Sequence, residues 1–197
     1  MLKLYHAPRS RSSRFIWLLE ELGAPYELER VSIRRGDGSG ELDPKNPHPH
    51  GKVPVVVHDG TTVFESAAVA LYLTDAFPDK GIGPRSGDER RGAYLTWLAY
   101  YAGVLEPAFV SNFMKVSVPR GTAGWVDAGE AMTHVEGALA AGPFLLGERF
   151  SAADVLYGST FALFLGSPLL PEQPLLRSYV TRCQARPAYA RAAAKDT

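Results

Sequence analysis

Gly51-Lys52-Val53-Pro54-Val55-Val56-Val57 and the nearby Phe64-Glu65-Ser66-Ala67-Ala68 are the most informative segments of this chain. The valine run is typical of a buried strand. Pro54 belongs at the first residue of such a strand because proline cannot donate a hydrogen bond to the sheet. Glu65 and Ser66 precede a mostly apolar run that favours a helix. We therefore expect a strand, a hairpin and then a helix that begins near Glu65.

These two segments also offer a place for a small, extended, acidic peptide. A cis bond before Pro54 turns the backbone N–H and C=O of Val53 outward, where they can pair with a peptide as an added strand. The first turn of a helix at Ser66 presents free N–H groups and the positive end of the helix dipole, which suit a carboxylate. The simpler interpretation is that Glu65 and Ser66 only start a helix, where an acid and a hydroxyl are both favoured.

Composition sets broad limits on the class of protein. The chain has 197 residues, which allow one large or two small domains. Its 21 Lys and Arg balance its 21 Asp and Glu, so it lacks the basic excess that a nucleic-acid or anionic membrane surface needs. No apolar run approaches the roughly 20 residues of a membrane span. The single Cys183 excludes an internal disulfide and favours the cytoplasm.

The spacing of apolar residues along the sequence predicts two domains. Residues 1–78 read as strand, helix, strand, a long loop, two strands and a helix, which is a thioredoxin-like order. Residues 79–87 are rich in Gly and Pro and form the linker. Every strong period in residues 88–197 is helical, and we expect Pro107 to kink or break the long helix from Arg90 to about Val116.

Asn46-Pro47, Gly51-Lys52-Val53-Pro54 and Glu65-Ser66-Ala67 together resemble the glutathione-binding half of the cytosolic glutathione transferases. The resemblance extends over nearly the whole chain. It implies an α+β fold, with an N-terminal thioredoxin-like βαβ-ββα domain followed by an all-α helical bundle. It also implies a bacterial-type detoxification enzyme that uses glutathione as substrate, holds no metal, forms a homodimer, and binds neither nucleic acid nor membrane.

The resemblance assigns roles in glutathione binding. Ser66, with its N–H, holds the γ-glutamyl carboxylate, and Glu65 holds the α-ammonium group. Lys52 contacts the glycine carboxylate, unless it is simply a solvated lysine. The Val53-Pro54 segment pairs with the peptide backbone. His50 either sits over the glycyl end or lines the loop.

Ser10 lies between the first strand and the first helix, where the simplest role for a serine is an N-cap. Ser12 or Ser13 can take that role instead. Ser10 and Arg14 resemble the serine-type transferases, which implies that the Ser10 hydroxyl is aimed at the glutathione sulfur. The alternatives for this thiol-activating role are Ser12, Ser13, Tyr5 and His6.

The free energy that this hydroxyl must supply to ionise the thiol follows from the pKa of the thiol. A thiol of pKa near 8.5 is only about 3% thiolate at pH 7. Lowering this pKa by about two units requires about 2.7 kcal/mol of preference for the anion. One hydrogen bond to a charged acceptor supplies about 1.5–3 kcal/mol. A single hydroxyl is therefore sufficient, and no metal or general base is required.

The helical half carries candidates for the second substrate, a small hydrophobic electrophile. They are Tyr100, Phe109, Phe113 and Met114, although aromatic residues at helical spacing are more often core. Farther on, Ser151 and Asp154 match a capping box, which we interpret as a folding signal. We expect conjugation of glutathione to the electrophile. The alternatives are a glutathione-dependent peroxidase, isomerase or dehalogenase, and a non-catalytic interaction or regulatory domain.

Overall fold

The computed structural model describes all residues 1–197, which divide into two compact units. The N-terminal unit comprises residues 1–80 and 186–197, and the helical unit comprises residues 81–185. The sequence analysis assigned the last twelve residues to the second domain, whereas the structure places them in the first unit.

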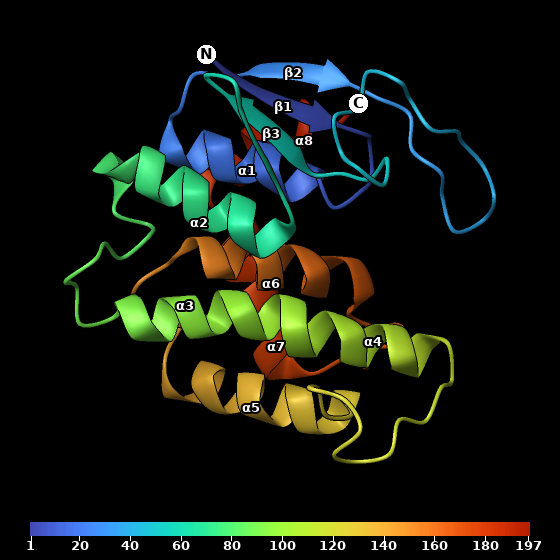
Figure 1. The fold of residues 1–197 in the computed structure, drawn as a ribbon. Coiled ribbons are helices and arrows are strands. Elements are labelled where there is room, and N and C mark those ends of the chain that lie inside the picture. Colours follow the sequence, from blue (N-terminus) through green and yellow to red (C-terminus); the bar gives the residue numbers. More distant parts are fainter. The chain divides into compact units, whose positions relative to one another are not determined.

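A mixed four-stranded sheet in the order β2-β1-β3-β4 forms the centre of the N-terminal unit (Figure 1). The central strand β1 pairs in parallel with β2 and antiparallel with β3, which in turn pairs antiparallel with β4. The thioredoxin-like prediction is therefore confirmed. The elements are β1 (Leu2–His6), α1 (Ser13–Leu22), β2 (Glu27–Arg30), β3 (Val55–His58), β4 (Thr61–Phe64), α2 (Ser66–Ala76), a 3-10 turn η1 (Pro78–Lys80) and α8 (Pro187–Ala193).

Apolar side chains of the sheet and the first helix form the core of this unit. Leu4 on β1 and the start of the valine run on β3 are fully buried. Helix α1 is buried with them on all sides from Phe15 to Leu19. The helix stops at Gly23, whose φ of 62° is a left-handed cap that glycine adopts without steric cost.

The C-terminal helix α8 docks on α1. The rings of Trp17 and Tyr189 meet edge-on, with centroids 5.2 Å apart. Arg186 donates two hydrogen bonds to the carboxylate of Glu21, at 2.6 and 2.8 Å, and this carboxylate is largely buried. A bidentate pair of this kind fixes orientation as well as position. The end of the chain is thereby held against the N-terminal unit.

The helical unit contains only helices and connecting loops, so the prediction of an all-α second domain is confirmed. Its elements are α3 (Arg91–Tyr100), a π-helical turn η2 (Tyr101–Leu105), α4 (Glu106–Phe113), α5 (Ala128–Ala141), α6 (Ala152–Phe164) and α7 (Pro174–Gln184). Most of α6 is buried, which makes it the central helix of the unit. None of the helices in the chain is long and apolar enough to cross a membrane.

The expected interruption at Pro107 takes the form of the π-helical turn. Proline lacks the N–H that would bond the carbonyl of Gly103, and its ring clashes with that carbonyl in a regular α-helix. The turn just before Pro107 is wider, and α3 and α4 continue through it as one rod (Figure 1). Pro107 therefore bulges this helix and does not break it.

The capping box predicted for Ser151 and Asp154 is present at the start of α6. The Asp154 carboxylate is fully buried and accepts four hydrogen bonds. They come from the N–H of Ser151 (2.8 Å), the hydroxyl of Ser151 (3.0 Å), the N–H of Leu145 (2.9 Å) and the hydroxyl of Tyr179 (3.0 Å). This one carboxylate therefore connects α6 to α7 and to the loop before α6. A helix cap alone would need only the bonds at Ser151.

Asp154→Ala should lower the free energy of unfolding by about 2–5 kcal/mol, because each buried donor left without an acceptor costs about 1–3 kcal/mol. Denaturant unfolding measures this change. Ser86→Ala, which removes an exposed hydroxyl, is the control and should leave the midpoint unchanged. An Asp154→Ala midpoint equal to that of the wild type would contradict the assignment.

Candidate active site

The turn from Ala7 to Ser12 connects β1 to α1 and carries the first candidate residue, Ser10. The hydroxyl of Ser10 donates to the carbonyl of Ala7 at 2.6 Å and lies 2.7 Å from the hydroxyl of Ser12. Its backbone carbonyl accepts the N–H of Ser13 at 3.1 Å, which closes the turn. The preceding Arg9 has a φ of 54°, in the left-handed region that L residues rarely adopt. The turn is therefore tightly specified by its own hydrogen bonds.

Ser10 does not cap the helix. The N-cap position of α1 belongs to Ser12, whose side chain caps no helical N–H. The Ser10 oxygen accepts the N–H of Ser12 at 3.2 Å, within the turn. Its hydroxyl is half-buried, so it is placed where a ligand can reach it without loss of a helix cap.

The alternatives to Ser10 occupy different positions. Ser12 and His6 are fully buried and lie within hydrogen-bond distance of each other, so a ligand cannot touch either one directly. Ser13 is half-buried and accepts the N–H of Ser10 at 3.2 Å. Tyr5 packs against a buried cluster that contains Ala7.

The backbone of Val53, where a peptide edge is predicted, has no partner in the sheet. The Val53-Pro54 bond is cis, and the N–H and C=O of Val53 make no hydrogen bond within the chain. The side chain of Val53 is buried with Ala7 and Val31. Unpaired backbone groups beside a packed side chain suit the addition of a short peptide strand.

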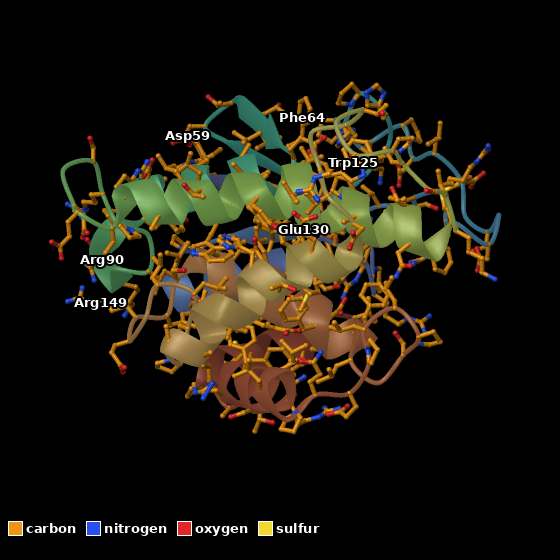
Figure 2. All side chains as sticks on the ribbon, turned by 90° about the horizontal axis from the view of Figure 1, so that it is seen from below. Asp59, Phe64, Arg90, Trp125, Glu130 and Arg149 are labelled. Carbon is orange, nitrogen blue, oxygen red and sulfur yellow. The ribbon has the colours of Figure 1, made fainter.

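The start of α2, where an anion site is predicted, presents free backbone N–H groups. The helix begins at Ser66, and the N–H groups of Ser66, Ala67 and Ala68 have no acceptor within the chain. Glu65 has a φ of 71° and a ψ of 128°, a conformation whose cost is of order 1–3 kcal/mol for a residue other than glycine. Ser66 is largely buried, whereas Glu65 is exposed. Figure 2 labels Phe64 at the end of β4, immediately before this helix start.

The Asn46 side chain organises the loop that carries Lys52. Its Nδ2 donates to the carbonyl of Lys52, and its Oδ1 accepts the N–H of His48, both at 3.0 Å. The N–H of His50 then donates to Nδ1 of His48 at 3.0 Å. The backbone of Lys52 is thus held by Asn46, while its side chain is exposed.

His48 is a residue that the sequence analysis missed in favour of its exposed neighbour His50. The ring of His48 is largely buried, and its centroid lies 4.9 Å from that of Phe64. Burial lowers the pKa of His48, against the opposing effect of the nearby Glu65 charge. The repeated His-Pro alternation of residues 47–50 gave no signal of which ring would turn inward.

The four electrophile candidates all lie along the rod formed by α3 and α4, but they differ in exposure. Phe109 is buried in the core, whereas Phe113 and Met114 at the end of α4 are 77% and 64% exposed. The half-buried ring of Tyr100 lies 5.0 Å from that of His134 on α5. Burial and the charge of Glu130, labelled in Figure 2, raise the pKa of Tyr100. Of these four, only Phe109 is enclosed within this unit.

No group of three or more His, Cys, Asp or Glu side chains in the chain is arranged to hold a metal ion. The single thiol of Cys183 is buried.

Residues 1–75 match the family model described as the glutathione S-transferase N-terminal domain. Solved structures extend the likeness to the whole chain. A glutathione transferase from Methylococcus capsulatus is 28% identical, with coverage of 100% of this chain and 98% of that one and a TM-score of 0.78. Residues 1–75 thus carry the glutathione S-transferase N-terminal domain, and the chain as a whole has the fold of the solved glutathione transferases.

Two further family members are informative. Glutathione S-transferase 3 of Schizosaccharomyces pombe is 29% identical over 175 residues, which make up 78% of this chain and 70% of that transferase. A sphingomonad glutathione S-transferase in complex with glutathione is 25% identical, with a TM-score of 0.77 and coverage of 98% of both chains.

Ser66→Ala should weaken glutathione binding by about tenfold or more, because a hydrogen bond to a charged group contributes about 1.5–3 kcal/mol. Turnover at saturating glutathione should change little, since this contact is equal in the ground and transition states. Calorimetric titration and steady-state kinetics measure the two effects. Normal affinity with reduced turnover would contradict the role of Ser66 in binding.

Proposed function

We propose that this protein conjugates glutathione to a small hydrophobic electrophile. The observation that carries the proposal is the combination, within the N-terminal unit, of a peptide edge, an anion site and an activating hydroxyl. These are the free backbone of Val53, the unpaired N–H groups at Ser66 and the hydroxyl of Ser10. Each suits a different part of one molecule: the peptide backbone, the γ-glutamyl carboxylate and the thiol.

The two ends of glutathione carry charges that neighbouring residues complement. The N-terminus of α2 and the Ser66 hydroxyl receive the γ-glutamyl carboxylate, and the exposed Glu65 receives the α-ammonium group. Lys52, held by Asn46, reaches the glycine carboxylate. The exposed His50 adds a polar contact at the glycyl end.

Ser10 stabilises the thiolate in this proposal. In the free protein its hydroxyl donates to the carbonyl of Ala7. A bound thiolate is a charged acceptor and competes with that carbonyl, because hydrogen bonds to ionised acceptors are roughly twice as strong as neutral ones. Rotation about one side-chain bond redirects the hydroxyl to the sulfur. The thiolate then attacks the electrophilic carbon.

The helical unit supplies the apolar contacts for the electrophile. Tyr100, Phe113 and Met114 present surface for this purpose. We leave Phe109 out of this role because its side chain is buried in the core of the unit. The single Cys183 is buried and forms no disulfide, which accords with a cytoplasmic location.

A calorimetric titration with glutathione, followed by turnover assays on aryl halides, epoxides, isothiocyanates and peroxides, tests the proposal. Binding together with conjugation of a carbon electrophile supports it. Binding with turnover of peroxides alone indicates a peroxidase. The absence of binding contradicts the proposal and leaves an interaction domain.

Ser10→Ala should raise the pKa of the bound glutathione thiol by about one to two units, from the size of one charge-assisted hydrogen bond. Turnover at pH 7 should fall about tenfold or more, and higher pH should restore part of it. Glutathione affinity should change little, because the carboxylates and the backbone carry binding.

The ultraviolet absorbance of bound thiolate, recorded against pH, measures this pKa in the wild type and in Ser10→Ala. Ser86→Ala removes an exposed serine and should titrate like the wild type. Coincident titrations of wild type and Ser10→Ala would refute the role of Ser10, and Ser13 would be tested next.

We also propose that the protein is a homodimer, as its resemblance to the glutathione transferases implies. Light scattering at micromolar concentration should give twice the chain mass of 21.4 kDa. A species of one chain mass throughout this range would contradict the proposal.

A further inference from the structure

A chain of polar groups runs from the Ser10 hydroxyl into the interior of the N-terminal unit and ends at the C-terminal segment. The hydroxyl oxygens of Ser10 and Ser12 are 2.7 Å apart. The Ser12 oxygen lies 2.9 Å from Nδ1 of His6. On the other side of the ring, Nε2 of His6 lies 3.2 Å from Oδ1 of Asp196. Four side chains thus connect a half-buried hydroxyl to a carboxylate through a fully buried imidazole.

The surroundings of each group assign the proton positions. A carboxylate 3.2 Å from Nε2 repels a lone pair and attracts a proton, so we place the ring proton of neutral His6 on Nε2. This N–H does not point directly at the carboxylate, so the two groups attract each other electrostatically but do not form a well-aligned hydrogen bond. Nδ1 then carries a lone pair that faces the Ser12 hydroxyl.

Ser12 directs its own proton toward that lone pair. Its oxygen accepts the N–H of Ala7 at 3.1 Å, and its contact with Nδ1 of His6 is shorter than its contact with the carbonyl of Ala7, at 2.9 against 3.3 Å. Its remaining lone pair faces the Ser10 hydroxyl. Each hydroxyl can therefore donate inward, toward His6.

The C-terminal segment holds Asp196 in place. The same Oδ1 atom accepts the N–H of Arg9 at 3.1 Å, within the turn that carries Ser10. Arg30 donates to the carbonyl and the hydroxyl of Thr197, both at 2.8 Å. Lys195 pairs with Glu20 on α1. The carboxylate is thus fixed from both sides along the chain.

We propose that His6 is the acceptor of the glutathione thiol proton, which reaches it through the hydroxyls of Ser10 and Ser12, and that Asp196 stabilises the imidazolium that forms. The proposal rests on the function proposed above and adds the destination of the proton.

The transfer balances without any further reactant. The thiol S–H proton passes to the oxygen of Ser10, whose own proton passes to the oxygen of Ser12. The Ser12 proton passes to Nδ1 of His6. The S–H bond breaks and an Nδ1–H bond forms, so a neutral thiol and a neutral imidazole become a thiolate and an imidazolium. Both hydroxyls are regenerated.

The direction of every hydrogen bond reverses in this step. Nδ1–H of His6 now donates to Ser12, Ser12 donates to Ser10, and Ser10 donates to the thiolate. Hydrogen bonds aligned in one chain polarise one another, so the anion is stabilised more strongly than by an isolated hydroxyl. Before the transfer, the Ser10 proton turns from the carbonyl of Ala7, at 2.6 Å, to the oxygen of Ser12, at 2.7 Å.

The surroundings of His6 keep its imidazole unprotonated before glutathione binds, so that it can accept a proton. Burial lowers the pKa of His6, and the charge of Arg30 on the neighbouring strand β2 lowers it further, whereas the charge of Asp196 raises it. The ring is therefore neutral at pH 7 and able to take a proton. A thiolate bound at the other end of the chain adds a negative charge, which favours the imidazolium.

A count of the protons released on binding tests the proposal. Glutathione, or S-methylglutathione as the blank without a thiol, is added at pH 7 in weak buffer with an indicator dye, and the thiolate absorbance is recorded in parallel. In the wild type the thiolate should appear with almost no release of protons, because His6 retains them. Release of about one proton per thiolate, as the thiol would give to solvent, would overturn the proposal.

Two variants interrupt the chain at different points. In Ser12→Ala and in Asp196→Asn, release should rise toward about one proton per thiolate, and the thiolate fraction at pH 7 should fall severalfold. Asp196→Asn keeps an acceptor for the N–H of Arg9 and changes only the charge. Its matched control is Asp79→Asn, which removes the same charge from an exposed carboxylate outside the proposed site and should behave like the wild type.

The outcomes separate this proposal from the function on which it rests. If glutathione does not bind, or binds without a thiolate signal, the proposed function fails. If the thiolate forms in the wild type with one proton released, and both variants match the wild type, the function stands and the role of His6 is refuted. If Ser12→Ala does not fold, the wild-type count and Asp196→Asn decide.

Discussion

The packing of Ala7 against Val53 and Val31 is the contact on which the candidate site depends. Ala7 follows the last residue of β1, and its N–H and C=O bond the hydroxyls of Ser12 and Ser10. Its side chain is buried with Val53, whose free backbone forms the peptide edge. One small residue therefore separates the unpaired backbone of Val53 from the hydroxyl of Ser10, the two groups to which the proposed function assigns the peptide and its thiol. A larger side chain here would separate the two, because interiors are close-packed.

The C-terminal segment gives the N-terminal unit a part of its active turn. Helix α8 is anchored on α1 by the Glu21–Arg186 pair, and the residues after it reach the Ser10 turn through Asp196. A thioredoxin-like order of strands and helices does not need such a segment, since its sheet and two helices are complete by residue 76. The segment therefore places a carboxylate beside His6 and the Ser10 turn, which the sheet and its two helices do not supply.

Local signals predicted the elements of this protein well. Gly23 ended α1, the valine run formed β3, and the acid and hydroxyl before an apolar run marked the start of α2. These signals are reliable because propensity, capping and turn chemistry act over a few residues. The prediction for Pro107 was right about its position. The irregularity takes the form of a π turn in place of a break, a detail that the position of the proline alone did not predict.

The sequence by itself determined the layout of a thioredoxin-like unit followed by helices, and it placed the peptide edge at Val53 and the helix start at Ser66. Both features are local: each is a property of a few consecutive residues. Only the tertiary structure decided that His6 is buried beside Ser12, that His48 and not His50 turns inward, and that Asp196 lies within ion-pair distance of His6. These contacts join residues up to 190 positions apart, and nothing in the local pattern encodes such a pairing, because it is fixed by the packing of α8 on α1.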